Sequence, residues 1–249
     1  MAELIKKLFA VIWQSPHTLL IVTSLMWAGH ANVLKTSIGE VSPMLLMGLR
    51  WIGCFIILTI FLRSDVKKFI PTVKNRLAWV WIVGGLGMAG FTICLIIAAE
   101  YTSVINLGIT QSFIPAIVMM LGLTVLGTSI SKAQGVGLLL SLFGAIVLVT
   151  KGSPLTLIDF KFNFGDLVML IGCFCYAGYT LGLSKRINMP PTVMFVFFSF
   201  FASLTLIFCI FIEFLNDDLV WPGVKGATII VYCIIFPSIL AQTFFMRGV

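Results

Sequence analysis

The stretch AAEYTSVINLGITQSFIP, residues 98–115, connects two long apolar segments and turns the chain back on itself. Its second part places Asn106, Thr110 and Gln111 on one side of a helix, because residues four or five positions apart share a face. Pro115 follows and cannot donate a hydrogen bond to the carbonyl of Gln111, so we predict a kink there. A polar side on a membrane helix lines a water-filled path or bonds to neighbouring helices.

The whole chain is too apolar for a soluble protein. Hydrophobic residues make up 60% of its 249 residues and charged residues 10%, against roughly 45–50% and about 25% in soluble domains. Mean hydropathy is +1.13. Segments of about 20 residues are apolar on all sides, which is the length needed to cross a hydrocarbon core of roughly 30 Å. We therefore predict an all-α, polytopic membrane helical bundle.

Eight membrane-spanning helices are predicted, and their connections are mostly short, so sequence neighbours should be antiparallel. The predicted spans are residues 18–35, 43–62, 77–98, 103–126, 133–150, 165–184, 192–213 and 226–246. Pro237 lies in the last span and predicts a second kink. Residues 1–16 are predicted to form an interfacial segment, because Ser15 and Pro16 interrupt its amphipathic pattern before a full span is reached.

The basic residues favour one side of the predicted bundle. With a cytoplasmic N-terminus, 11 of the 16 lysines and arginines lie on the cytoplasmic side, 4 lie on the other side and Arg50 lies within a span. This distribution follows the positive-inside rule. The expected location is therefore a bacterial cytoplasmic (inner) membrane, with the N-terminus inside. The net charge of +7 indicates topology rather than nucleic-acid binding, which needs a basic face on a soluble element.

The chain contains a weak internal repeat. Trp27-Ala28-Gly29 in the first span matches Tyr176-Ala177-Gly178 in the sixth, at an offset of 149 residues. Because the two units are five spans apart, an odd number, the second enters the membrane from the opposite face. Inverted repeats of this kind are typical of secondary transporters, whose substrate site lies near the membrane midplane between the halves.

An ordered series of short motifs resembles the EamA domains of the drug/metabolite transporter superfamily. The first domain is matched by Trp27-Ala28-Gly29-His30, Lys35, Ser42-Pro43, Arg50, Ala98-Ala99-Glu100-Tyr101-Thr102-Ser103, Pro115, Gly135 to Gly144 and Gly152. The start of the second is matched by Gly165-Asp166 and Tyr176-Ala177-Gly178-Tyr179. The resemblance implies ten helices in two inverted halves, cytoplasmic termini, and export or exchange of small metabolites.

Three departures from that pattern stand out. Family members typically carry Asn at the position of His30 and an acidic residue at the position of Thr128. With the 149-residue offset, Val249 corresponds to Glu100, so the equivalents of spans nine and ten are absent. We therefore expect a first repeat of five helices at 17–152 and an incomplete second repeat of three helices at 153–249, in a fragment rather than an eight-helix carrier.

Polar and aromatic residues near the repeat motifs are the candidates for binding a substrate. Arg50 is expected either to bind a carboxylate or phosphate of the substrate or to tie backbone carbonyls together. His30 is expected either to carry a proton or to form a neutral hydrogen bond within the bundle. The full set of substrate-binding candidates is Trp27, His30, Arg50, Asn106, Thr110, Gln111, Tyr176 and Tyr179.

Other classes of function find less support. The six cysteines lie within spans and only two histidines are present, so we predict no disulfide framework, metal site, cofactor or catalytic residue. The alternatives to a secondary transporter are a membrane enzyme or flippase acting on a lipid or polyprenyl carrier, and a receptor or assembly subunit. The expected partners are a small metabolite, the lipid bilayer, and a coupling proton or counter-metabolite. Small residues at four-residue spacing from Ala133 to Ala145 indicate internal packing or a homodimer face.

Overall fold

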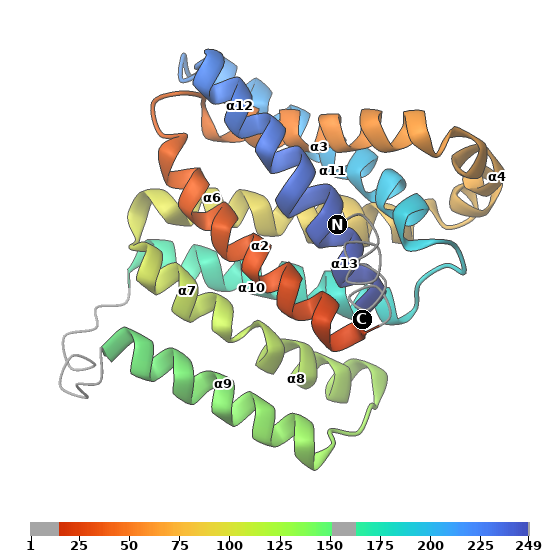
Figure 1. The fold of residues 1–249 in the computed structure, drawn as a ribbon, viewed down its shortest axis with the longest axis vertical. Helices are drawn as coiled ribbons and strands as arrows, with labels where there is room; N and C mark the ends of the chain where they lie inside the picture. Colours follow the sequence, from red (N-terminus) through yellow and green to blue (C-terminus); the bar gives the residue numbers. More distant parts are fainter. Residues whose placement is uncertain (1–14, 151–162, 249) are drawn as a thin grey trace, which may run out of the picture. The chain divides into compact units, whose positions relative to one another are not determined.

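The computed structural model describes residues 15–150 and 163–248, and every regular element in these ranges is a helix (Figure 1). The helices are α2 (Pro16–Thr36), α3 (Pro43–Phe61), α4 (Arg63–Lys74), α5 (Leu77–Val80), the π-helical segment η1 (Trp81–Met88), α6 (Ala89–Tyr101), α7 (Val104–Ser112), α8 (Ile114–Leu126), α9 (Lys132–Thr150), α10 (Phe164–Ser184), α11 (Pro191–Leu215), α12 (Val224–Cys233), the π-helical segment η3 (Ile234–Leu240) and α13 (Ala241–Gly248). The predicted interfacial segment 1–16 lies outside the described residues except for Ser15 and Pro16.

The predicted all-α membrane bundle is confirmed, whereas the predicted count of eight spans is not. Within residues 15–150 and 163–248, six continuous helical stretches are long and apolar enough to cross a membrane. Neither α2 nor α9 is among these six stretches, although both are helices of about span length, Pro16–Thr36 and Lys132–Thr150. The six stretches are Pro43–Phe61, Leu77–Tyr101, Ile105–Leu126, Phe164–Ser184, Pro191–Leu215 and Val224–Gly248.

Prolines mark where several helices begin. Pro16 and Pro43 occupy the first turns of α2 and α3, each after a serine in an extended conformation. A proline is well tolerated there because the first N–H groups of a helix have no intrahelical partner. The side chain of Ser15 also accepts a hydrogen bond from the backbone N–H of Thr18, which satisfies one of the free donors.

The helices form two compact units, and each contains elements from both predicted repeats. One unit comprises the chain up to Gly85 and from Arg186 onward, and the other comprises Leu86–Lys185. In the first unit, α3 packs along α11 and η3, while α2 packs along α13. Gly53 of α3 allows this close approach, because a Cβ there would lie 2.3 Å from a side-chain carbon of Ile234. The predicted repeat boundaries remain a prediction.

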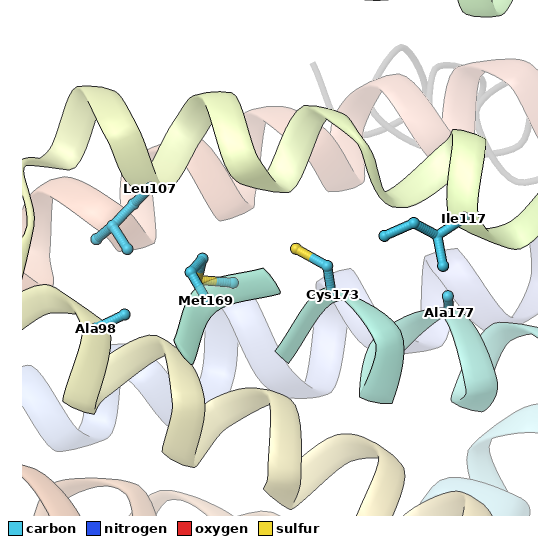
Figure 2. Close-up of a cluster of buried hydrophobic side chains, with 6 residues drawn as sticks. All are labelled: Ala98, Leu107, Ile117, Met169, Cys173 and Ala177. Carbon is cyan, nitrogen blue, oxygen red and sulfur yellow. The ribbon is translucent and has the colours of Figure 1, made fainter. Parts of the chain in front are cut away.

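The second unit is built around α10, which packs against α6, α7 and α8. Its core is a buried apolar cluster contributed by four helices. Figure 2 shows this cluster, which consists of Ala98, Leu107, Ile117, Met169, Cys173 and Ala177. Gly172 allows α10 to approach α6, since a Cβ there would lie 2.8 Å from the Cβ of Cys94.

Candidate functional site

Arg50 is a buried cation within a membrane-spanning helix. It lies two turns into α3 and its side chain is 8% exposed. Its Nη1 lies 3.3 Å from Nε2 of His30 and 3.4 Å from Sδ of Met47, and its Cζ lies 4.5 Å from the centroid of the Trp51 ring. Its Nε is buried and has no hydrogen-bond partner among the described residues.

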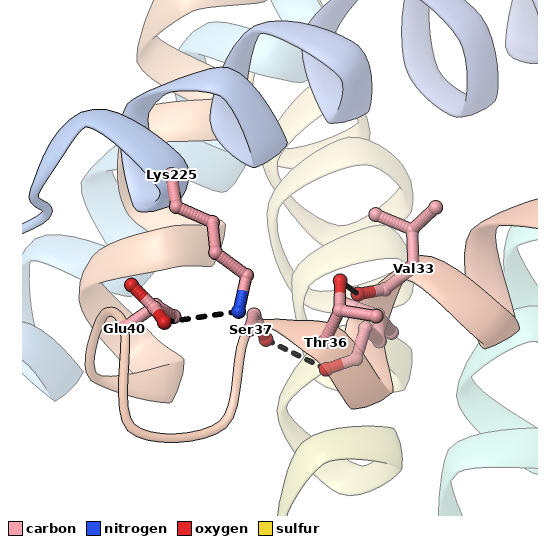
Figure 3. A network of polar contacts seen from close by, with 6 residues as sticks. Val33, Thr36, Ser37, Glu40 and Lys225 are labelled. Atoms are coloured by element: carbon pink, nitrogen blue, oxygen red, sulfur yellow. Dashed lines mark hydrogen bonds and ion pairs between the residues drawn. The ribbon is translucent and has the colours of Figure 1, made fainter.

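No carboxylate among the described residues lies within ion-pair distance of Arg50. The ion pair found in residues 15–150 and 163–248 joins Lys225 to Glu40 at 3.0 Å, and both side chains are partly exposed (Figure 3). An arginine within a span costs about 2.5–3.5 kcal/mol on insertion scales. A cation–π contact returns about 0.5–2 kcal/mol, and a thioether is a weak acceptor. The protein contacts of Arg50 therefore leave its charge largely uncompensated.

The contact with Arg50 is a hydrogen bond only for one protonation state of His30. A guanidinium has only donors, so Nε2 of His30, 3.3 Å away, must be the acceptor. The imidazole is then neutral and carries its proton on Nδ1. A second proton on Nε2 would break this hydrogen bond and place two positive charges side by side.

Trp27 joins α2 to the irregular last span. Its Nε1 donates a hydrogen bond of 3.1 Å to the carbonyl oxygen of Pro237, and its ring centroid lies 5.4 Å from that of Phe245. Pro237 lies inside η3 and has no N–H for the carbonyl of Cys233, four residues earlier. The hydroxyl of Ser238 donates to that carbonyl instead, at 2.7 Å. The proline therefore lies in a π-helical segment whose freed carbonyl is satisfied by a side chain.

Asn106 of α7 belongs to a buried carboxylate network in the second unit. Its Nδ2 donates to Oδ2 of Asp166 at 3.4 Å, while Thr102 donates to Oδ1 at 2.7 Å and the backbone N–H of Asn163 donates to Oδ2 at 2.9 Å. Asp166 is fully buried. Asn163 and Asp166 form a capping box at the start of α10. The network therefore ties together the ends of α6, α7 and α10.

The sequence analysis did not select Asp166 as a candidate. Asp166 lies at the start of the predicted span 165–184, where a carboxylate is expected to be solvated. The sequence does contain a pattern that predicts a hydrogen-bonded role for Asp166. Asn163 and Asp166 have the three-residue spacing of a capping box directly before an apolar run.

Thr110 and Gln111 lie near the end of α7, where helical hydrogen bonding is interrupted. The hydroxyl of Thr110 is buried and donates to the carbonyl of Asn106 at 3.0 Å, and Gln111 is half-buried. The helix ends at Ser112, and α8 begins at Ile114 with Pro115 in its first turn. Pro115 therefore lies directly after a break between two short helices.

Two tyrosines of α10 extend a row of aromatic rings in the second unit. The ring centroid of Tyr176 lies 5.0 Å from that of Phe91 and 5.4 Å from that of Tyr179. Tyr179 is buried, whereas Tyr176 is half-buried.

The candidate residues fall into two groups, one in each compact unit. The first unit holds Trp27, His30 and Arg50 and brings the last two into contact. The second unit holds Asn106, Thr110, Gln111, Tyr176 and Tyr179.

Within the described ranges, no group of three or more His, Cys, Asp or Glu side chains is arranged to hold a metal ion.

Comparisons with known proteins relate this chain to a group of transporters. Residues 14–150 match the EamA-like transporter family. The chain is 24% identical over 164 residues to the uncharacterized transporter YyaM of Bacillus subtilis (strain 168), a match that covers 66% of this chain and 53% of that protein. It is 28% identical over 176 residues to an uncharacterized transporter of Archaeoglobus fulgidus, covering 69% of this chain and 58% of that protein. The chain thus spans a little over half the length of these relatives.

Two further similarities cover more of the chain. The uncharacterized transporter YetK of Bacillus subtilis (strain 168) is 24% identical over 223 residues, which covers 86% of this chain and 66% of that protein. A protein of known crystal structure is 19% identical to this chain and superposes on it with a TM-score of 0.73. The superposition covers 92% of this chain and 77% of the other protein's chain. At this identity the structural match establishes the fold alone.

Proposed function

Since the chain belongs to the EamA-like transporter family, we propose that it is a secondary-active transporter that exports or exchanges a small metabolite by alternating access. Membership of a transporter family argues against the alternative of an enzyme. The inverted offset between Trp27 and Tyr176, which lie five predicted spans apart, supports a mechanism in which two inverted halves rock around a midplane site. The bias of basic residues supports a cytoplasmic N-terminus in a bacterial inner membrane.

The observation that carries the proposal is the uncompensated charge of Arg50. Its Nε lacks a partner among the described residues, and the hydrogen-bond contacts of its Nη1 are with side chains, those of His30 and Met47. The alternative role of Arg50 as a tie to backbone carbonyls therefore receives no support. A guanidinium fork binds a carboxylate or phosphate through two parallel hydrogen bonds. The substrate is accordingly a metabolite with a carboxylate or phosphate group.

His30 and Trp27 complete the binding site in the first unit. A neutral imidazole beside Arg50 leaves the guanidinium free to hold an anion and offers an Nδ1–H donor to the same substrate. Trp27 is half-buried and supplies an aromatic wall for the apolar part of a metabolite. Because protonation of His30 would oppose the charge of Arg50, exchange against a counter-metabolite fits this site better than proton coupling through His30.

The second unit supplies the remaining proposed elements. Asn106, Thr110, Gln111, Tyr176 and Tyr179 contribute to the translocation path. The break before Pro115 in this unit, and the π-helical segment at Pro237 in the first unit, provide places where helices bend. The stripe of small residues on α9, which has open space beside Gly137, is the surface through which two copies would pair.

Counterflow in proteoliposomes tests the proposal. The full-length protein is reconstituted with panels of carboxylates, phosphate esters, neutral amides and amines, and the exchange of labelled substrate is measured. We expect saturable exchange of anionic metabolites, and a loss of at least about 30-fold in Arg50→Gln, equivalent to about 2 kcal/mol. Arg50→Lys should remain well below the wild type because it lacks the planar fork. Arg76→Gln, which removes an exposed cation, is the matched control.

The outcomes separate the two parts of the proposal. Flux that is unsaturable and unaffected by collapsing every ion gradient would refute carrier action. Saturable exchange of neutral or cationic metabolites, undiminished in Arg50→Gln, would leave a carrier in place and refute the anionic substrate class.

A further inference from the structure

An open groove of about 420 Å³ lies in the first unit where the end of α3 meets α4. Its walls are apolar and are formed mainly by Phe55, Ile56, Ile60, Ile70 and the side chains of two exposed cations, Arg63 and Lys67. Ile56 and Ile60 are 49% and 68% exposed on a helix that is apolar enough to cross a membrane. The groove therefore opens toward the environment of the spanning helices.

The groove results from a sharp change of direction after α3. The span ends at Phe61, a single residue follows, and α4 begins at Arg63 (Figure 1). The short helix is amphipathic, with Val66 and Val73 buried while its charged residues are exposed. An amphipathic basic helix directly after a span is typical of a segment lying at the membrane interface.

The two cations of the groove are adjacent and have no anionic partner among the described residues. Arg63 and Lys67 are four residues apart and share a face of α4; both line the groove and are exposed. The nearest acid in sequence, Asp65, does not line the groove, because it lies about 200° around the helix from Arg63. Thr59 also lines the groove, and its hydroxyl is buried.

We propose that this groove binds an anionic phospholipid, with one acyl chain against Ile56 and Ile60 and the phosphate between Arg63 and Lys67. The apolar walls favour an acyl chain over a soluble anion, which would leave them exposed. The paired cations select an anionic headgroup, because basic residues near a membrane surface attract anionic lipids. This site is separate from Arg50 and does not depend on the transported substrate.

Native mass spectrometry of the full-length protein in mild detergent provides the test. The protein is titrated with phosphatidylglycerol and, separately, with phosphatidylcholine of the same acyl chains. We expect the first phosphatidylglycerol to bind more tightly than the first phosphatidylcholine. In the double variant Arg63→Gln, Lys67→Gln this binding should weaken about 30-fold, which corresponds to about 2 kcal/mol.

Two further variants separate charge from shape. The matched control Lys68→Gln, Lys132→Gln removes two positive charges outside the groove and should bind phosphatidylglycerol as the wild type does. Ile56→Trp keeps both groove cations but fills the apolar floor, so it should also weaken binding. Monodispersity in size-exclusion chromatography establishes that each variant is folded.

A phosphatidylglycerol analogue with a photoreactive acyl chain identifies the site directly. We expect the label on peptides that contain residues 55–70. Three results would each overturn the proposal. The two lipids could bind equally well, or the groove and control variants could lose binding equally. These peptides could also cross-link to a second copy of the chain in place of the lipid.

Discussion

Replacing Asp166 should destabilise the junction of α6, α7 and α10 in a graded manner. The carboxylate is fully buried and accepts two short hydrogen bonds, of 2.7 Å from Thr102 and 2.9 Å from the backbone of Asn163. The third, from Asn106, is 3.4 Å long and adds little. At about 1.5 kcal/mol for each short bond to a charged acceptor, Asp166→Ala should lower the free energy of unfolding by about 3 kcal/mol.

The asparagine variant separates the charge from the shape of this side chain. Asp166→Asn retains one oxygen, which can accept from the backbone N–H of Asn163, and its amide can donate to the hydroxyl of Thr102. Both short bonds then lose the charge and become about half as strong, so the expected cost is about 1.5 kcal/mol. Asp65→Ala, which removes an exposed acid from the first turn of α4, is the control and should change stability by less than about 0.5 kcal/mol.

Thermal unfolding in detergent, followed with a thiol-reactive dye, measures these differences. The dye reports exposure of buried cysteines such as Cys173. For a chain of this size, 3 kcal/mol corresponds to a fall in melting temperature of about 6–12 °C, and the asparagine variant should lose about half as much. A double-mutant cycle with Thr102→Val should give a coupling energy of about 1 kcal/mol. Equal effects of Asp166→Ala and Asp166→Asn, or no coupling to Thr102, would refute this account of the network.

Three other changes test the rest of the molecule. Gly84→Ala should lower the free energy of unfolding by about 1–3 kcal/mol, because the added Cβ would lie 2.7 Å from the backbone of α11. The control Gly178→Ala, whose Cβ would meet nothing within 4 Å, should be neutral or stabilising in thermal unfolding. Trp27→Phe removes the donor to the carbonyl of Pro237 and should cost about 1 kcal/mol in the same assay. Arg50→Leu should leave the melting temperature unchanged or raised, because it removes an unpaired buried charge, yet abolish counterflow; a large loss of stability would instead indicate a structural role.

The helices were predictable from sequence because their signal is strong and local. Runs of apolar residues identify the spans, and prolines at positions 16, 43 and 191 fall in the first turns of α2, α3 and α11. The helix α4 was missed and treated as a link, because five of its twelve residues are charged and Pro71 lies inside it. Its apolar and basic residues nevertheless recur at the three- and four-residue spacing of an amphipathic helix.

The contacts of the candidate residues were harder to predict than their positions in the spans. The cost of a charge in lipid indicates that the side chain of Arg50 must face protein or water. The apolar periodicity of the helices does not identify the side chain that contacts Arg50. That side chain belongs to His30, which is twenty positions away in the sequence. For Asp166 the obstacle was different. Its place near a helix end suggested solvation, whereas the side chains of Thr102 and Asn163 enclose it. Burial at a helix end depends on tertiary packing, which hydropathy does not report.

The arrangement around Arg50 depends on parts of the chain that are distant in sequence. The hydroxyl of Thr23 in α2 donates to the carbonyl of Ala241, and the indole of Trp27 donates to that of Pro237. The thiol of Cys54, one turn beyond Arg50 on α3, donates to the carbonyl of Ile234 at 3.7 Å. Because η3 receives hydrogen bonds from both α2 and α3, a change in its π-helical geometry must shift the two helices that carry His30 and Arg50. The irregular last span is therefore the element through which a conformational change could reach the proposed anion site.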